Sequence, residues 1–460
     1  MKVTEAIVTP ITSTDESRTV SSDDAAMKAR WRPLLFALLI VALVLRLIAA
    51  NVVERHVQNA GRSFLIEGDA NGYWELGRKI AAGEDYSLHQ PPRRILRTPG
   101  FPLWLAGSIR LFGVDIAAAR YGLAVLGTFA CWLTFELGRR VHMTRTGFWA
   151  ALYVAVHPLQ IVTSVMILSE TLFSVCMLAS LLALHRLLEH VAARNRESNS
   201  DSDANQTSVP PWQLAIATGV LIGLTILVRP GFVPWLLVAA LALLLCLRQA
   251  ASPRWIPAAV VVLACVVTLS PWAVRNYQVS GRWVLTSLWS GPSLYDGLNP
   301  TADGTSNMQF FDDENVMGRQ QMSEYDMNRH YRDRAIRFAM ENPATATKLA
   351  FRKAALFLNP VPGSLQQSNW AVRAICVLFW AWLFLFAVAG SWSRQWEWQD
   401  LLVLVGPFLL FLLIHMVFVG SVRYRLPVEF PLAVLAAIGW RHCVLNLKNR
   451  AKDDPVRVDR

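Results

Sequence analysis

The chain has 460 residues, of which 54% are hydrophobic and 17% charged, and its mean hydropathy is +0.34. A soluble domain carries about 25% charged residues, so this composition excludes an ordinary soluble protein. The net charge of +11 does not indicate nucleic-acid binding. Many Lys and Arg residues flank apolar segments, where basic residues orient membrane proteins and contact anionic lipid headgroups. Composition and charge predict an all-α polytopic membrane protein.

Apolar segments near 20 residues long, the length that crosses about 30 Å of hydrocarbon as a helix, recur along the chain. Residues 1–30 precede the first segment and are rich in Ser, Thr and Asp, which predicts a disordered cytoplasmic tail. Residues 31–447 form one transmembrane domain, and residues 448–460 form a basic cytoplasmic tail. We expect about ten transmembrane helices: Leu34–Val53, Ile116–Leu137, Phe148–Leu168, Glu170–Leu188, Trp212–Val228, Phe232–Leu247, Ile256–Trp272, Val372–Gly390, Asp400–Gly420 and Val428–Leu445.

Two long loops lie between these helices on the outer side. The first covers residues 54–115 and contains Pro99–Gly113, an apolar stretch too short to span, which predicts a helix along the membrane surface. The second covers residues 273–370, between spans 7 and 8. Its segment Ala344–Leu358 sets basic side chains against apolar ones, a pattern typical of an interfacial amphipathic helix.

Candidate catalytic groups are few. Asp69, in the sequence GDANGYWELG, would share a helix face with Tyr73 at spacing i, i+4. Its carboxylate could deprotonate an acceptor hydroxyl or bind a divalent cation, or it could cap the helix. Glu170 lies at a membrane boundary, where an ionisable group indicates function, although Ser169 and Glu170 could simply begin a helix. His89 could act as a base or be an ordinary turn residue.

Several arginines depart from the tendency of basic residues to be cytoplasmic. Arg46 lies within the first span, where its guanidinium must reach the interface, bind an anion or pair with another helix. Guanidinium groups match phosphate oxygens bidentately. Arginines beside outer span ends therefore predict a phosphate site, with contact to bulk lipid headgroups as the alternative. This outer set consists of Arg97, Arg229, Arg275, Arg423 and Arg425.

Five stretches spread over residues 34–440 carry a family resemblance. They are GDANGYWELGRKIAAG, RTPGFPLWLAGSIRLFG with AAARYGLAVLG, HPLQIVTSVMILSETLF, SPWAVRNYQVSGRWVLTSLWSGPSLYDGLNP and RYRLPVEFPLAVLAAIGW. In their order and spacing they resemble the GT-C superfamily of polyprenyl-phosphate-sugar-dependent glycosyltransferases. The similarity is to the bacterial branch akin to protein O-mannosyltransferases and the aminoarabinose transferase of lipid A.

The resemblance implies a multi-pass protein of the inner (plasma) membrane with an exoplasmic active site. Asp69 would be its general base or metal ligand. Many relatives have two adjacent acidic residues there, whereas Ala70 follows Asp69 here, so a divalent cation is not firmly implied. Arg423 and Arg425 match the family's basic pair before the last span and would hold the donor phosphate. The residues expected to bind substrate are Tyr73, Tyr424 and His89.

The expected reaction moves a sugar from a polyprenyl-phosphate donor to a hydroxyl of a protein, lipid or glycan, in a single displacement that inverts the anomeric carbon. Membrane lipids are the other expected partners. Two alternatives stay open. A transporter of lipid-linked saccharides commonly has inverted repeats with matched broken helices, and the sequence has no such matched halves. An inactive relative could serve as a scaffold.

Overall fold

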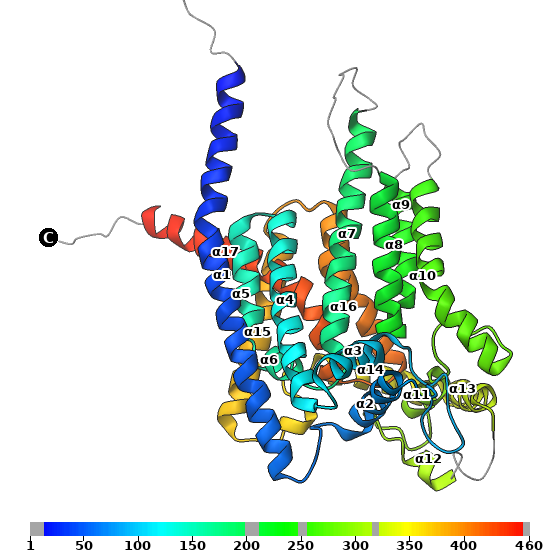
Figure 1. The fold of residues 1–460 in the computed structure, drawn as a ribbon. Helices are drawn as coiled ribbons and strands as arrows, with labels where there is room; N and C mark the ends of the chain where they lie inside the picture. Colours follow the sequence, from blue (N-terminus) through cyan, green and yellow to red (C-terminus); the bar gives the residue numbers. More distant parts are fainter. Residues whose placement is uncertain (1–12, 198–210, 247–254, 315–321, 454–460) are drawn as a thin grey trace, which may run out of the picture.

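The computed structural model describes residues 13–197, 211–246, 255–314 and 322–453, and in these residues the regular structure is entirely helical, as the sequence predicts. Figure 1 shows long helices side by side, with short helices gathered at one end. The helices that run along the bundle are α1 (Ser13–Asn59), α4 (Ile116–Val141), α5 (Thr144–Val156), α7 (Glu170–Glu197), α8 (Pro211–Val228), α9 (Val233–Cys246), α10 (Ile256–Ser280), α15 (Trp370–Trp392), α16 (Trp398–Val417) and α17 (Val422–Asp453). The short helices at that end are α2 (Glu67–Ala82), α3 (Gly100–Phe112), α11 (Ser290–Gly297), α12 (Gln309–Glu314), α13 (Glu324–Glu341) and α14 (Pro343–Leu358).

Several of these helices are suited to a membrane. Within the described ranges, seven are long and apolar enough to cross one: Trp31–Asn59, Ile116–Val141, Glu170–Ala193, Ile256–Ser280, Trp370–Trp392, Trp398–Val417 and Val422–Asn446. Two shorter apolar helices cover Trp212–Val228 and Pro230–Cys246. The chain is a multi-pass membrane protein, as expected, and the count of about ten spans stays a prediction.

The helix expected over Phe148–Leu168 is interrupted, which corrects the sequence prediction. α5 ends at Val156, and the six-residue helix α6 begins at Pro158. Proline has no backbone N–H and favours an extended conformation in the residue before it, and His157 has that conformation, with φ of −67° and ψ of 116°, so the chain breaks between α5 and α6. The 13 residues of α5 measure about 20 Å, less than the hydrocarbon thickness.

Arg46 of α1 binds the interrupted end of α5. Its side chain is fully buried and donates hydrogen bonds to the carbonyl oxygens of Val154 and Ala155, both at 3.2 Å, and of Ala42 at 3.1 Å. The last carbonyl groups of a helix have no partner within it. The structure therefore gives Arg46 a helix-pairing role, the structural alternative considered from the sequence, and not a place in a phosphate site.

Some boundaries also differ from the prediction. α10 continues past Trp272 to Ser280, and α17 begins at Val422. Arg275 therefore lies inside α10, and the pair Arg423 and Arg425 lies at the start of α17 instead of in a loop before it. Helical hydrogen bonds pair the backbone N–H and C=O groups in the headgroup region of the membrane as well as in its hydrocarbon core. α10 and α17 can therefore extend beyond their apolar segments.

The two expected tails fall only partly within the described residues. Residues 1–12 and 454–460 lie outside them, while α1 begins at Ser13 and α17 ends at Asp453. Ala25 to Met27 are strong helix formers, so the backbone of α1 extends into the segment expected to be disordered.

Close helix approaches position the outer loops against the bundle. A Cβ at Gly219 of α8 would lie 2.3 Å from the carbonyl oxygen of Val261 in α10, so only glycine fits there. A Cβ at Gly100, the first residue of α3, would lie 2.7 Å from the carbonyl oxygen of Leu227. The first outer loop is thereby held against the end of α8, immediately before Arg229.

Candidate active site

Asp69 lies in the first turn of α2 and binds two arginines from distant parts of the chain. The N-cap residue of α2 is Ile66, so Asp69 does not cap the helix. Its Oδ1 accepts a hydrogen bond from Nη2 of Arg97 at 2.9 Å, and its Oδ2 accepts one from Nη1 of Arg423 at 2.8 Å. Asp69 and Arg423 are 354 residues apart. The carboxylate therefore joins the first outer loop to the last long helix.

Arg97, in the loop between α2 and α3, is oriented by an aromatic ring. Its guanidinium carbon lies 4.4 Å from the centre of the Tyr73 ring, within the range of a cation–π contact. The Tyr73 hydroxyl donates a hydrogen bond to Oγ of Ser169 at 3.5 Å, beside Glu170. Tyr73 thus connects Arg97 with the start of α7. It lies on the same face of α2 as Asp69, as the i, i+4 spacing predicts.

Arg423 bridges the two carboxylates of the site. Its Nη1 binds Asp69, and its Nε donates to Oε1 of Glu170, the first residue of α7. Nη1 of Arg229 lies 3.3 Å from the same Glu170 oxygen. The Tyr424 ring centre is 5.2 Å from the guanidinium carbon of Arg229 and 5.6 Å from that of Arg423. We call Asp69, Glu170, Arg97, Arg229 and Arg423 the ion-pair cluster.

The ion-pair cluster carries a surplus of positive charge. Three guanidinium groups face two carboxylates, and the side chain of Glu170 is only 1% exposed while those of Arg97 and Arg423 are 20% and 19% exposed. Burial by itself would raise the pKa of Asp69, but Arg97 and Arg423 outweigh it and hold this pKa well below its usual value. The arrangement suits an anion that contacts the partly exposed arginines.

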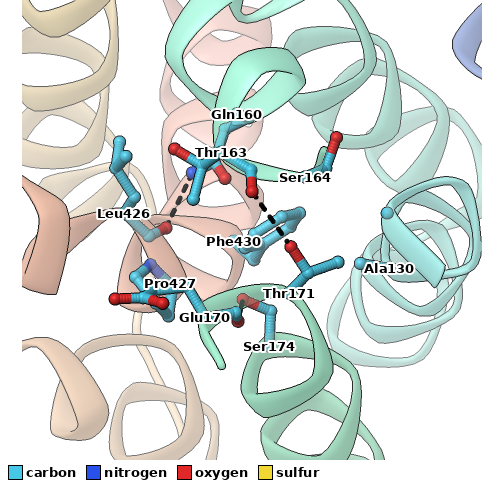
Figure 2. A pocket seen from close by; sticks show the side chains of 11 residues that line it. Ala130, Gln160, Thr163, Ser164, Glu170, Thr171, Ser174, Leu426, Pro427 and Phe430 are labelled. Carbon is cyan, nitrogen blue, oxygen red and sulfur yellow. Dashed lines mark hydrogen bonds between the residues drawn. The ribbon is translucent and has the colours of Figure 1, made fainter. Parts of the chain in front are cut away.

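Glu170 also faces a small cavity between α4, α6, α7 and α17 (Figure 2). Its Oε2 is buried and has no hydrogen-bond partner in the described part of the chain. On one wall the Thr171 hydroxyl donates to the carbonyl oxygen of Thr163, and on another Nε2 of Gln160 donates to the carbonyl oxygen of Leu426. Neither Arg229 nor Arg423 is among the residues that line this cavity.

The turn before Arg423 is held by two residues that the sequence analysis did not single out. Lys353 of α14 donates from Nζ to the carbonyl oxygen of Val417 at 2.7 Å. His415 is 2.8 Å from the carbonyl oxygen of Val419 through Nδ1, which must therefore carry the proton. In the sequence these were polar residues on largely apolar faces of α14 and α16, a pattern too common to identify a positioning residue.

Lys353 leads to a prediction about pH. Its side chain is fully buried; burial lowers its pKa to about 8, although Asp296 opposes this. An unfolded lysine titrates near pH 10.4, so between about pH 8 and 10.4 the unfolded chain binds more protons and stability rises with pH. We expect the Tm of the wild type minus that of Lys353→Met to increase from about pH 7 to about pH 9.5. A difference that stays constant would contradict this account.

Arg425 lies outside the ion-pair cluster, contrary to the role of donor-phosphate ligand expected from the family pattern. It is 1% exposed and binds Oε1 of Glu429 through Nε at 2.6 Å. Its Nη1 donates to the carbonyl oxygens of Phe357 and Asn359 at 2.7 and 2.8 Å. Arg425 therefore holds the end of α14 against α17 and has no exposed surface to offer a substrate.

We expect Arg425→Ala to destabilise the protein by about 3–5 kcal/mol, because Glu429 would keep a buried charge without its partner. Thermal unfolding in detergent would measure the loss. The double variant with Glu429→Gln should recover part of it, since the uncompensated charge is gone. An Arg425→Ala protein of unchanged stability would contradict this structural role.

Two further predicted residues do not join the ion-pair cluster. Arg275 donates from Nη1 to the carbonyl oxygen of Arg94 at 2.6 Å and from Nη2 to that of Tyr86 at 3.2 Å. It therefore fastens the first outer loop to α10. His89 is exposed on the turn of that loop, with φ of 63°. Its predicted role in substrate binding has no contact with the ion-pair cluster to support it.

The residues at this site are a poor match to the divalent cation considered from the sequence. In the described residues no three or more His, Cys, Asp or Glu side chains gather as a metal site would require. Asp69 and Glu170 are the carboxylates of the ion-pair cluster, and the arginines already bind both oxygens of Asp69 and Oε1 of Glu170. Three positive groups around two carboxylates disfavour a further cation there.

Residues 96–197 match the family model of dolichyl-phosphate-mannose-protein mannosyltransferase, a segment that includes Arg97 and Glu170. No curated protein matches the chain. Among solved structures, the oligosaccharyltransferase of Archaeoglobus fulgidus tethered with an acceptor peptide matches with a TM-score of 0.51 and 13% identity, over 92% of this chain and 51% of that one. The chain has the GT-C fold.

Two other solved structures are similar to this chain. The oligosaccharyltransferase AglB from Archaeoglobus fulgidus, in complex with an inhibitory peptide and a dolichol-phosphate, has a TM-score of 0.49 and 13% identity over 93% of this chain and 52% of that chain. ArnT from Cupriavidus metallidurans, bound to undecaprenyl phosphate, has a TM-score of 0.41 and 15% identity over 92% of this chain and 79% of that chain. This chain spans about half the length of the archaeal enzymes. The GT-C fold expected from the sequence is confirmed.

Proposed function

We propose that this GT-C protein is a membrane glycosyltransferase. It transfers a sugar from a polyprenyl-phosphate donor to a hydroxyl group of a protein, lipid or glycan acceptor, at the exoplasmic face of the inner (plasma) membrane. The observation that carries the proposal is the ion-pair cluster. Five charged groups from five separate parts of the chain meet where short helices cover one end of an apolar bundle.

A lipid-linked phosphate suits this location. The polyprenyl chain stays in the hydrocarbon between apolar helices, and the phosphate reaches the end of the bundle where Arg97 and Arg423 are partly exposed. Guanidinium groups bind phosphate through two parallel hydrogen bonds. The match of residues 96–197 to the dolichyl-phosphate-mannose-protein mannosyltransferase model supports the same class of donor.

The proposed reaction is a single displacement. Asp69 accepts the proton of the acceptor hydroxyl, the acceptor oxygen forms a bond to the anomeric carbon of the sugar, and the bond from that carbon to the phosphate oxygen breaks. Its electron pair stays on the phosphate, and polyprenyl phosphate leaves. The leaving group is already a stable anion, so no general acid is needed. The arginines stabilise the added negative charge, and such preorganised electrostatics is usually the largest catalytic contribution.

Glu170 has a positioning role in this proposal. It is buried at the first residue of α7 and binds Arg423 and Arg229 through one oxygen. A buried carboxylate between two guanidinium groups fixes both in one arrangement. Tyr73 stacks on Arg97, and Tyr424 stacks on Arg229 and Arg423. In this proposal the two tyrosines, which the sequence predicted to bind substrate, orient the arginines that bind it.

Purified protein in proteoliposomes provides the test. The probes are polyprenyl-phosphate hexoses and pentoses labelled in the sugar, offered with membranes that supply acceptors. A transferase moves the label to an acceptor and releases free polyprenyl phosphate in equal amount. A transporter of lipid-linked saccharides, the alternative, moves the intact labelled lipid between leaflets without that release, and an inactive scaffold does neither. Either of the last two results would refute the proposal.

A further inference from the structure

Asp69 and the arginines assigned to the donor phosphate are already bound to each other. Both carboxylate oxygens of Asp69 are engaged, one by Arg97 at 2.9 Å and the other by Arg423 at 2.8 Å. Arg423 also donates a hydrogen bond from Nε to Glu170. A phosphate bound at these guanidinium groups needs the same N–H donors, so it competes with the carboxylates for them.

We propose that Asp69 stands in for the donor phosphate, and that polyprenyl phosphate binds by displacing Asp69 from Arg97 and Arg423. This inference rests on the proposed function and concerns the control of the same site. The exchange is feasible because the surplus positive charge of the ion-pair cluster remains for the ligand. It is also local, since Asp69 is about one third exposed, whereas Glu170 is buried and stays with Arg229.

The exchange makes donor binding a requirement for catalysis. While both arginines hold Asp69, its pKa is far below its usual value, and so weak a base takes a proton from a hydroxyl poorly. When the phosphate draws the guanidinium groups away, these hydrogen bonds are lost and the carboxylate becomes more basic. The acceptor hydroxyl is then activated only in the presence of the donor, which protects the site from wasteful proton transfer.

Removing the charge of Asp69 changes donor affinity in opposite directions, depending on whether the carboxylate competes with the phosphate or holds a cation. If Asp69 competes with the phosphate, then removing its charge frees Arg97 and Arg423 and tightens donor binding. If instead Asp69 held a cation that contacts the phosphate, the same change would weaken donor binding. The two models therefore predict opposite signs for one measurement.

The measurement is the Kd of undecaprenyl phosphate, without sugar, for the full chain in detergent. We expect Asp69→Asn to bind about tenfold more tightly than the wild type, the factor that corresponds to losing one competing charge-assisted hydrogen bond. Glu75→Gln is the matched control: it removes one carboxylate from the same helix α2, where Glu75 pairs with Arg78 away from the site, and its Kd should equal that of the wild type.

A second variant guards against an Asp69→Asn protein that does not fold. Glu170→Gln keeps an amide oxygen that can still accept a hydrogen bond from Arg423 but removes the competing charge, so it should also bind undecaprenyl phosphate more tightly, by a smaller factor because Arg423 still holds Asp69. An equal or weaker affinity of the folded Asp69→Asn protein, or of Glu170→Gln where the first is unfolded, would overturn the exchange while leaving the transferase proposal intact. Absence of binding to the wild type would overturn the proposed function itself.

Discussion

Replacing Asp69 with asparagine is expected to lower the rate of sugar transfer by about 10²- to 10⁴-fold, the usual contribution of a general base. Asparagine has the same size and can still accept one hydrogen bond from an arginine, but it cannot take the proton of the acceptor hydroxyl. Release of polyprenyl phosphate from the labelled donor measures the rate. The protein should remain inserted and folded, because Asp69 is partly exposed.

The control for this experiment is again Glu75→Gln, which removes a carboxylate from the exposed side of α2. It should transfer sugar at the wild-type rate. An Asp69→Asn protein that retains full activity would show that another group accepts the proton. If the Asp69→Asn protein binds the donor more tightly and does not transfer sugar, both proposed roles of Asp69 are supported, as phosphate substitute and as base.

Replacing Arg423 with alanine is expected to lower kcat by about 10²- to 10³-fold, the cost of losing a preorganised donor to a developing oxyanion, and also to raise the KM for the donor. Arg423 is the one member of the ion-pair cluster bonded to both carboxylates. Arg423→Lys keeps the charge without the planar fork, so it should recover part of the donor affinity and little of kcat.

Arg78→Ala serves as the control for Arg423. Arg78 also lies between two carboxylates, those of Glu75 and Glu84, but its side chain is 37% exposed on the surface of α2. Exposed ion pairs contribute little to stability, so this variant should fold and transfer sugar normally. An Arg423→Ala protein with an unchanged KM for the donor would remove Arg423 from the proposed phosphate site.

The sequence pattern was most informative where local physics decides the structure. The apolar segments predicted most of the long helices, and the helices over Pro99–Gly113 and Ala344–Leu358 were expected as short separate elements. The i, i+4 spacing placed Tyr73 on the Asp69 face of α2. The segment Phe148–Leu168 misled, because its apolar composition concealed the effect of Pro158 on the backbone, and some helix ends extended beyond the apolar segments.

The arginines show where local reasoning stops. Arg423 and Arg425 looked equivalent as a basic pair, but on a helix two residues are separated by about 200° around the axis. They therefore point in different directions: Arg423 toward Asp69, and Arg425 toward Glu429 and the end of α14. A family pattern written for a loop does not contain that difference.

The sequence by itself determined that this protein is a bundle of membrane helices, with charged residues concentrated in and beside the two long loops. Hydrophobic length and charge asymmetry act on each segment separately, so they can be read without knowing the fold. Only the tertiary structure decided which arginines meet the carboxylates and which bind backbone carbonyls. The partners of each arginine depend on packing between segments as far apart in the sequence as Asp69 and Arg423. A buried guanidinium group forms hydrogen bonds with the acceptors that its neighbouring helices place beside it.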